Sequence, residues 1–271
     1  MTAEEARSIV LRLAVYDFAW DIEKSLELAL FRTFAVPTIS GLLAHTGEFV
    51  ARTRKRYDDT ELVLAEILEN GPDSARGAAA LARMNAMHGA YRITNESMLY
   101  VLSTFVFEPI RWIDRFGWRT MTEREKHASF VYYADLGRRM GIENIPTRAE
   151  ELEAFNRSFE ARHFRAAETN ARIGKATTDL LLGFYLPASL VPLGHPAVAA
   201  LMDQPLRRAM GVSDPPRWLE RAIPAALRLR ARCLRALPKR KRPKFATARS
   251  RPTYPDGYRV EQLGTFPEGR R

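Results

Sequence analysis

Apolar residues recur every three or four positions along most of the chain, up to about residue 235. This spacing gathers apolar side chains on one face of a helix, whereas a half-buried strand alternates with a period of two. It predicts helices over roughly 3–34, 38–70, 74–90, 95–116, 122–141, 147–183, 196–210 and 215–237. The sequence carries no convincing hairpin or alternating strand series. The expected fold class is therefore all-α, with a single multi-helix globular domain over residues 1–237.

Prolines and turn residues mark where these helices should end or bend. Pro37 lacks a backbone donor, so we expect the first helix to end or kink just before it. Pro109 lies inside the predicted helix 95–116, where it frees a carbonyl and bends the axis. Glu108 and Arg111, one turn apart, are expected to form an ion pair at this bend; the lining of a substrate channel is the alternative.

Composition narrows the class of protein. The chain has 271 residues and is 46% hydrophobic, which is sufficient for a large buried core. Its single cysteine, Cys233, permits no intramolecular disulfide, and the sequence after Met1 does not follow a signal-peptide pattern. A cytoplasmic protein is expected.

Positive charge is concentrated near the C-terminus. Residues 221–271 contain fifteen Lys or Arg and only three acidic residues, so residues 1–220 are nearly neutral although the whole chain carries +10. After about residue 238 the helical period ends, which predicts a basic, Pro-rich extended arm over 238–271. We expect this arm to pack on the body through Tyr254, Tyr258 and Phe266. Its basic run suits a solvated tail or an anionic membrane surface, and nucleic acid is disfavoured as a partner.

The segment 180–202 is the most apolar in the chain. Pro187, Pro192 and Pro196 interrupt it, which argues against a membrane span. We expect instead a helical pair that is buried or faces a membrane, giving a protein that is cytoplasmic or peripherally attached to a membrane.

Two one-turn spacings carry candidate chemistry: Arg56 with Thr60, and His88 with Arg92. Residues four apart share one face of a helix. A single histidine at the end of an apolar face is commonly a core or capping residue. A haem site, however, would use such a neutral imidazole as an iron ligand and a nearby arginine for the propionates.

Co-linear blocks of sequence support the second interpretation, because they resemble the MpaB-like branch of the rubber-oxygenase (latex-clearing-protein) catalytic domain superfamily. The blocks are YDF at 16–18, FRTFAVPTIS at 31–40, TGEFV at 46–50, KRYDDT at 55–60, RMNAMHG at 83–89, TNESMLYVLSTFVFEPIRW at 94–112 and MGIENIP at 140–146.

The resemblance implies an oxygenase that binds one haem b and uses O2 to oxidise an apolar, isoprenoid-like substrate, with cleavage of a carbon–carbon double bond as one outcome. It implies that His88 is the axial iron ligand and that Arg92 anchors a propionate or positions the His88 helix. Arg56 and Thr60 would then polarise oxygen on the distal side. Rubber oxygenases have a Lys just before the distal Thr, whereas this chain has Asp59, so coordination of iron by that Lys does not carry over.

Other candidates remain beside this one. Glu48 is a loose match for the acid–base glutamate of the family. Glu160 and His163 form one Glu-x-x-His pair, which makes His163 an alternative iron ligand, but a di-iron carboxylate site needs two such pairs and two further glutamates. A non-catalytic, membrane-associated helical protein is the other alternative. The chain has no P-loop, dinucleotide fingerprint, Cys-x-x-Cys pair or GxSxG elbow, so neither ATP nor NAD is implied.

Overall fold

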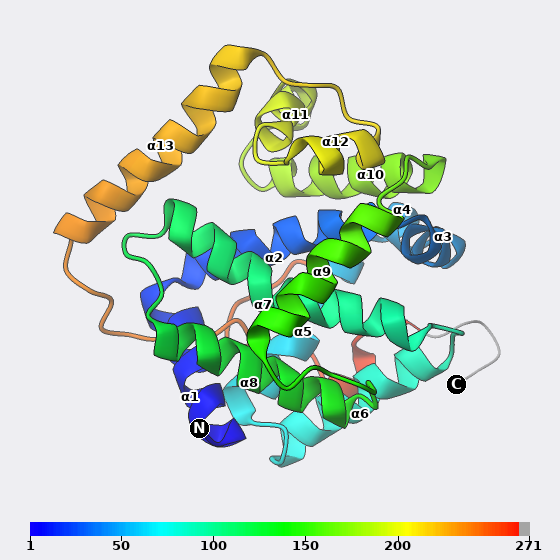
Figure 1. Ribbon diagram of the computed structural model, residues 1–271, viewed down its shortest axis with the longest axis vertical. Coiled ribbons are helices and arrows are strands. Elements are labelled where there is room, and N and C mark those ends of the chain that lie inside the picture. Colours follow the sequence, from blue (N-terminus) through cyan, green and yellow to red (C-terminus); the bar gives the residue numbers. More distant parts are fainter. Residues whose placement is uncertain (266–271) are drawn as a thin grey trace.

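The computed structural model describes residues 1–265 and contains helices but no strand in that range, as the all-α prediction required (Figure 1). A π-helical turn (Leu13–Asp17) and two 3-10 turns (Ala188–Leu190 and Val260–Gln262) accompany the α-helices. The α-helices are α1 (Ala3–Arg12), α2 (Ala19–Phe34), α3 (Pro37–His45), α4 (Glu48–Ala51), α5 (Thr53–Asn70), α6 (Ala75–Gly89), α7 (Asn95–Phe116), α8 (Glu123–Arg139), α9 (Ala149–His163), α10 (Glu168–Gly183), α11 (Val191–Ala199), α12 (Gln204–Met210) and α13 (Arg217–Ala236).

Several predicted helices are divided by single residues that leave the helical conformation. Phe18 (φ −135°, ψ 32°) separates the π-helical turn from α2, so the predicted helix 3–34 is wrong as one element. Gly47 (φ +72°) and Arg52 (φ −137°) divide the predicted helix 38–70 into α3, α4 and α5. The positive φ of Gly47 suits glycine, but apolar spacing continues across all three breaks and does not reveal them.

Two later predictions were also too long. The predicted helix 147–183 ends at His163 because Phe164 is extended, and the N–H of Arg165 donates instead to the carbonyl of Ala35 at 3.4 Å. The predicted helix 196–210 is two helices. α11 ends at Ala199, and Asp203 then caps α12 by accepting a hydrogen bond from the N–H of Leu206 at 2.9 Å.

The corner before Pro37 confirms the predicted break. Val36 is extended, Pro37 opens α3, and α2 and α3 meet at a bend of 98°. Within residues 1–265 no single helix combines the length and apolarity needed to cross a membrane; α2 and α3 together meet those criteria only as this bent pair.

Three helix pairings build the body. α2 packs on α7, α1 on α8, and α5 on α6, while α13 runs along one edge of the molecule (Figure 1). The predicted ion pair at Pro109 is present, with Arg111 Nη1 2.7 Å from Glu108 Oε1. The same Glu108 also contacts Arg32 of α2 at 3.4 Å, so the Pro109 segment of α7 is tied to α2, its main neighbour.

The chain after α13 returns across α5 and α6. Val260 and Leu263 are buried there in a cluster with Leu62 and Met84. Tyr254 and Tyr258 pack against the same cluster as expected. Phe266 lies outside the described residues. We refer to residues 244–263 below as the arm.

Candidate functional site

His88 lies in the last turn of α6, in a setting that keeps its imidazole neutral. Its Nδ1 is buried and has no hydrogen-bond partner within residues 1–265. Burial and the positive charge of Arg56 lower the pKa of His88 to about 4. The ring is therefore uncharged at neutral pH, the state in which an imidazole can donate a lone pair to a metal.

The sequence of α6 explains this placement. Ser74 caps the helix, its Oγ accepting from the N–H of Gly77 at 3.0 Å. Ala80 and Met84 are buried against α5, and His88 follows one turn after Met84 on the same stripe. The apolar stripe thus ends in an imidazole.

Arg56 and Thr60 are paired on α5 as their spacing predicted. Arg56 Nη1 donates a hydrogen bond to Thr60 Oγ1, and the Arg56 guanidinium lies 5.0 Å from the centre of the Phe49 ring. Burial lowers the pKa of Arg56. Arg56 forms no ion pair with any residue that the structure describes. A buried guanidinium without a close carboxylate can stabilise negative charge that develops beside it.

Asp59, which stands where rubber oxygenases have a Lys, contacts the arm. It is buried, pairs with Lys55 at 2.6 Å, and accepts a hydrogen bond from the Tyr254 hydroxyl of the arm. Asp59 therefore holds the arm on α5. No local pattern around Asp59 indicated this contact, because Tyr254 lies 195 residues further along the chain.

Arg92 is not placed as its spacing suggested. α6 ends at Gly89, with Ala90 as its last capping residue, so Arg92 does not lie one helical turn beyond His88. Its side chain is exposed. The expected geometry on a continuous helix is wrong, because the chain turns away after Gly89.

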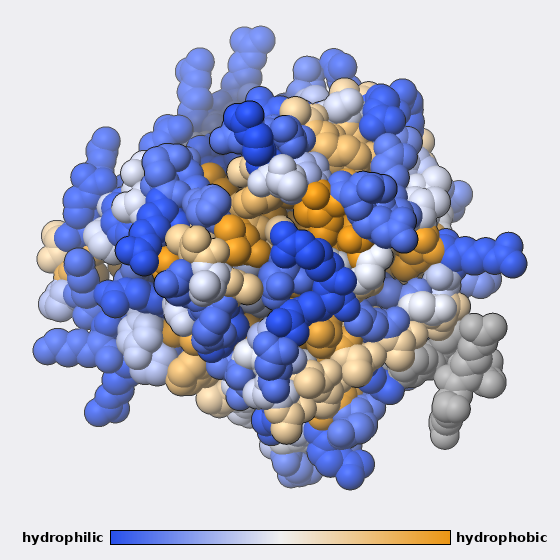
Figure 2. All heavy atoms as spheres, turned by 60° about the horizontal axis from the view of Figure 1, so that its bottom comes forward, coloured by the Kyte–Doolittle hydropathy of each residue, from blue (hydrophilic) through white to orange (hydrophobic). Residues whose placement is uncertain are grey.

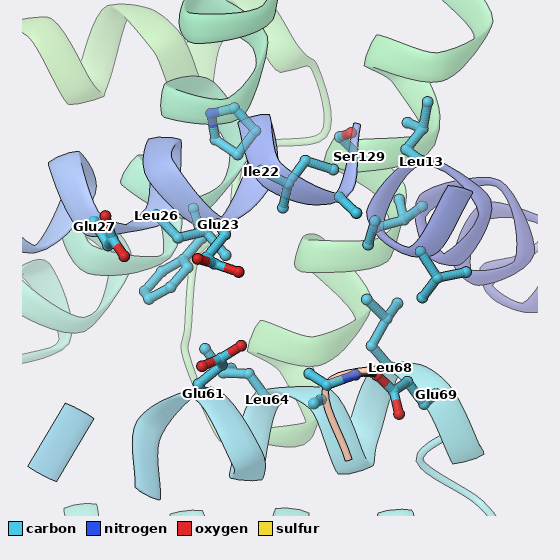
Figure 3. Close-up of a pocket in the computed structure, with 18 of the residues that line it drawn as sticks. Leu13, Ile22, Glu23, Leu26, Glu27, Glu61, Leu64, Leu68, Glu69 and Ser129 are labelled. Atoms are coloured by element: carbon cyan, nitrogen blue, oxygen red, sulfur yellow. Dashed lines mark hydrogen bonds between the residues drawn. The ribbon is translucent and has the colours of Figure 1, made fainter. Parts of the chain in front are cut away.

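Thr60 also lines an apolar cavity of about 150 Å³ between α2, α5, α7 and α8. Its walls are largely aliphatic and include Leu13, Ile22, Leu26, Leu64 and Leu68 (Figure 3). Pro109 lines it too, so this segment of α7 forms part of the cavity wall.

A cluster of charged residues forms one side of the cavity. Glu23 of α2 and Glu61 of α5 point toward one another across it (Figure 3). Arg249 of the arm lies between them, with Nη1 2.8 Å from Glu23 Oε2 and 3.5 Å from Glu61 Oε1. The arm therefore neutralises two facing carboxylates, a role that no local pattern in the sequence revealed.

A third carboxylate at the cavity, Glu27, has its own partners. Lys24 lies 2.7 Å from Glu27 Oε1, and the Tyr57 hydroxyl donates to the same oxygen at 2.8 Å. Burial nevertheless raises the pKa of Glu27. Glu48, the loose acid–base candidate, pairs with Arg52 on its own helix face and does not line this cavity.

His163, the alternative ligand, occupies a different environment. Its ring stacks on Phe159 with centroids 4.2 Å apart, and its Nε2 is buried without a partner. Glu160 is engaged by Arg32, whose Nε donates to it at 2.7 Å. Residues 1–265 bring no three His, Cys, Asp or Glu side chains together as a metal-binding group. The ligand set of the di-iron alternative is thus not assembled among these residues, and His163 itself is half-buried.

Comparison with known proteins identifies the family of this chain. Residues 28–236 match the family described as "ER-bound oxygenase mpaB/B'/Rubber oxygenase, catalytic domain". The ER-bound oxygenase mpaB' of Penicillium brevicompactum is 34% identical over 237 residues, which are 80% of this chain and 56% of that protein. The ER-bound oxygenase mpaB of Penicillium roqueforti (strain FM164) is 32% identical over 228 residues, 78% of this chain and 76% of the relative.

The chain spans only about half the length of the first of these relatives. The region that matches the family begins within α2 and continues to the end of α13. It includes Arg56, Thr60 and His88. The chain belongs to the family of mpaB and rubber-oxygenase catalytic domains.

Proposed function

We propose that this protein is a haem b-dependent oxygenase that oxidises an apolar, isoprenoid-like substrate with O2. The observation that carries the proposal is the neutral imidazole of His88 beside the Arg56–Thr60 pair; its Nδ1 is buried and has no partner among the described residues. Family membership supports the same chemistry.

The donor set fits a haem. His88 would ligate the iron, because its ring is neutral and its nitrogens make no hydrogen bond to the described residues. The haem, when bound, supplies the redox chemistry with dioxygen. Arg92, exposed just beyond α6, would reach a propionate from the rim of the site.

Arg56 and Thr60 would act on the oxygen side. The Arg56 guanidinium has N–H donors beyond the one bonded to Thr60, and burial strengthens its field. The Thr60 hydroxyl, on the cavity wall, donates to the Arg56 carbonyl at 2.9 Å, which fixes its orientation. Together they would stabilise negative charge developing beside the cavity.

The cavity supports an apolar substrate. Aliphatic side chains line most of it, and each buried methylene of a ligand contributes about 0.8 kcal/mol. An isoprenoid chain would lie against Leu26 and Leu64 and present a double bond near Thr60. Oxidative cleavage of that bond is the reaction we propose.

Peripheral attachment to an anionic membrane belongs to the same proposal. The mpaB and mpaB' relatives are named ER-bound, and apolar substrates partition into membranes. A docked enzyme would draw its substrate from that phase.

The test is an absorption spectrum of purified protein reconstituted with haem. Wild type should show a Soret band, His88→Ala should lose or shift it, and the matched control His163→Ala should keep it. A wild type without a Soret band, or an unchanged band in His88→Ala, contradicts the proposal. Two irons without porphyrin would support the di-iron alternative, and a colourless protein after ample haem supply would support the non-catalytic one.

A further inference from the structure

Helix α13 presents apolar side chains to solvent on the side that faces away from the body. Its inner side packs through residues such as Leu227, while Pro224 and Ala231 are buried. Trp218 and Leu229 are nevertheless 68% and 59% exposed. They lie eleven residues apart, three helical turns, and so share one face. The other residues on this outer face are small, and all are exposed: Ala222, Ala225 and Ala226 between them, and Cys233 and Ala236 beyond Leu229.

A row of arginines flanks this outer stripe. Arg221, Arg228 and Arg232 project beside it at helical spacing and are exposed. None of the three forms an ion pair or hydrogen bond with residues 1–265. Arginines that have no acidic partner in the protein are available to an external anion.

The basic character continues past the helix. Residues 239–242 are Lys-Arg-Lys-Arg and all are exposed. From residue 217 to 242 the chain contains ten Lys or Arg and one acidic residue, Glu220. The stripe, the arginine row and this run form one strongly cationic, partly apolar surface, which we call the α13 surface.

The position of α13 leaves this surface accessible. The helix runs along the outer edge of the molecule, with neighbours only on its inner side (Figure 1). By contrast, the face shown in Figure 2 carries apolar residues in separate patches between hydrophilic ones. A continuous apolar stripe beside a row of cations is typical of a helix that lies in a membrane interface.

We propose that the α13 surface docks on an anionic lipid membrane. Trp218 and Leu229 would enter the headgroup region, and Arg221, Arg228 and Arg232 would contact lipid phosphates. The inference rests on the membrane attachment proposed above and names the surface responsible. It also differs from the expectation from sequence, because the arm beyond residue 243 is engaged with α2, α5 and α6.

Charge and shape favour lipid over other occupants. A nucleic acid would use the arginines but would not bury a Trp–Ala–Leu stripe. A second copy of this chain would bring the same positive charge to the contact and would be repelled. Anionic lipid offers phosphates to the arginine row and an apolar phase to the stripe.

The lone cysteine makes docking directly measurable. Cys233 is exposed and lies on the outer stripe, so an environment-sensitive NBD fluorophore attached there reports entry into lipid. The labelled full-length protein is mixed with vesicles of phosphatidylcholine alone or with added phosphatidylserine. We expect a blue shift and co-sedimentation only with the phosphatidylserine vesicles.

Variants test the apolar stripe and the arginine row separately. Leu229→Asp should weaken vesicle binding about tenfold by placing a charge in the apolar stripe. Arg228→Glu with Arg232→Glu should weaken it at least tenfold, since each cation near the surface contributes about 1 kcal/mol. The matched control is Val50→Asp, which alters an exposed apolar residue (54%) on α4, away from α13. Vesicle binding should be unchanged by it, and circular dichroism checks that each variant is folded.

Two results would overturn the inference: an NBD spectrum unchanged by anionic vesicles, or unaltered vesicle binding of Leu229→Asp. The His88→Ala protein is measured in parallel. If His88→Ala loses the haem band but still binds vesicles, the result bears on the haem site alone. If wild type contains haem but does not bind vesicles, the docking surface is refuted and the proposed haem site is not.

Discussion

The charge of Arg56 on α5 acts on the imidazole of His88 on α6, and with burial it holds the pKa of His88 at about 4. Two residues from different helices thereby set one protonation state. A ligand with this pKa does not compete with protons for a metal at neutral or mildly acidic pH.

Arg56→Met should raise the pKa of His88 in the haem-free protein. Removing a nearby cation favours the protonated imidazole, but burial, the larger cause, remains, so the pKa should stay below 6.5. The His88 ring proton followed by NMR during a pH titration measures this. Arg52→Met, which removes an exposed cation one turn earlier, should leave the titration unchanged. An unaltered His88 pKa in Arg56→Met would show that the two side chains do not interact.

Acid should destabilise the haem-free protein through His88. The pKa of His88 is lower in the folded state than its ordinary 6.5, so the unfolded chain takes up this proton first. The stability contributed by neutral His88 is present above pH 6.5 and is lost as the pH falls from 6.5 to about 4, by up to about 3 kcal/mol.

Urea unfolding at several pH values tests this against His88→Leu, which cannot titrate at this position. The free energies of unfolding of the two proteins should diverge most between pH 6.5 and 4. Parallel curves over that range would mean that His88 is not buried in its neutral form.

Arg251→Met should destabilise the fold by about 2 kcal/mol, because it removes charge-assisted contacts to the carboxylates of Asp58 and Glu61. Arg54 remains paired with Asp58 at 2.9 Å, so that buried carboxylate is not left alone. Arg251 is 5% exposed and contacts Asp58, which is fully buried, at 3.2 Å and Glu61 at 2.5 Å. Urea unfolding measures the effect. Lys241→Met removes an exposed charge and should change stability little; equal effects of the two substitutions would argue against a structural role of the arm.

Leu26→Trp should fill the apolar cavity and weaken the binding of an apolar fluorescent probe such as N-phenyl-1-naphthylamine, while the haem band is retained. Probe fluorescence and the Soret spectrum are read on the same sample. Leu193→Trp, at a side chain that is 76% exposed, serves as the control. If Leu26→Trp binds the probe like wild type, the probe occupies another site.

Local features of the sequence predicted local structure well. The corner at Pro37, the Glu108–Arg111 pair and the stripe that ends at His88 each depend on residues within one or two turns. The all-α class follows from the same periodicity. Arg56 and Thr60 lie on one face of α5, as their spacing predicted, for the same reason.

Features that depend on distant residues were missed. In the sequence, Glu23 and Glu61 resemble ordinary surface charges; the structure places Arg249 between them. The burial of Asp59 likewise depends on its contact with the distant Tyr254. The expected position of Arg92 was wrong for a local reason, since α6 ends at Gly89, three residues before Arg92. Periodicity describes which face a residue occupies but not which distant segment covers it.

The arm also constrains the order in which the molecule can be assembled. Arg251 contacts Asp58 across 193 residues, and Tyr258 contacts Glu66 across 192. A chain made from its N-terminus forms the helices around the cavity before these partners exist. The side of the cavity that Arg249 occupies is therefore uncovered until the arm has been made. The contacts of the arm then complete the enclosure as a late, long-range step of folding.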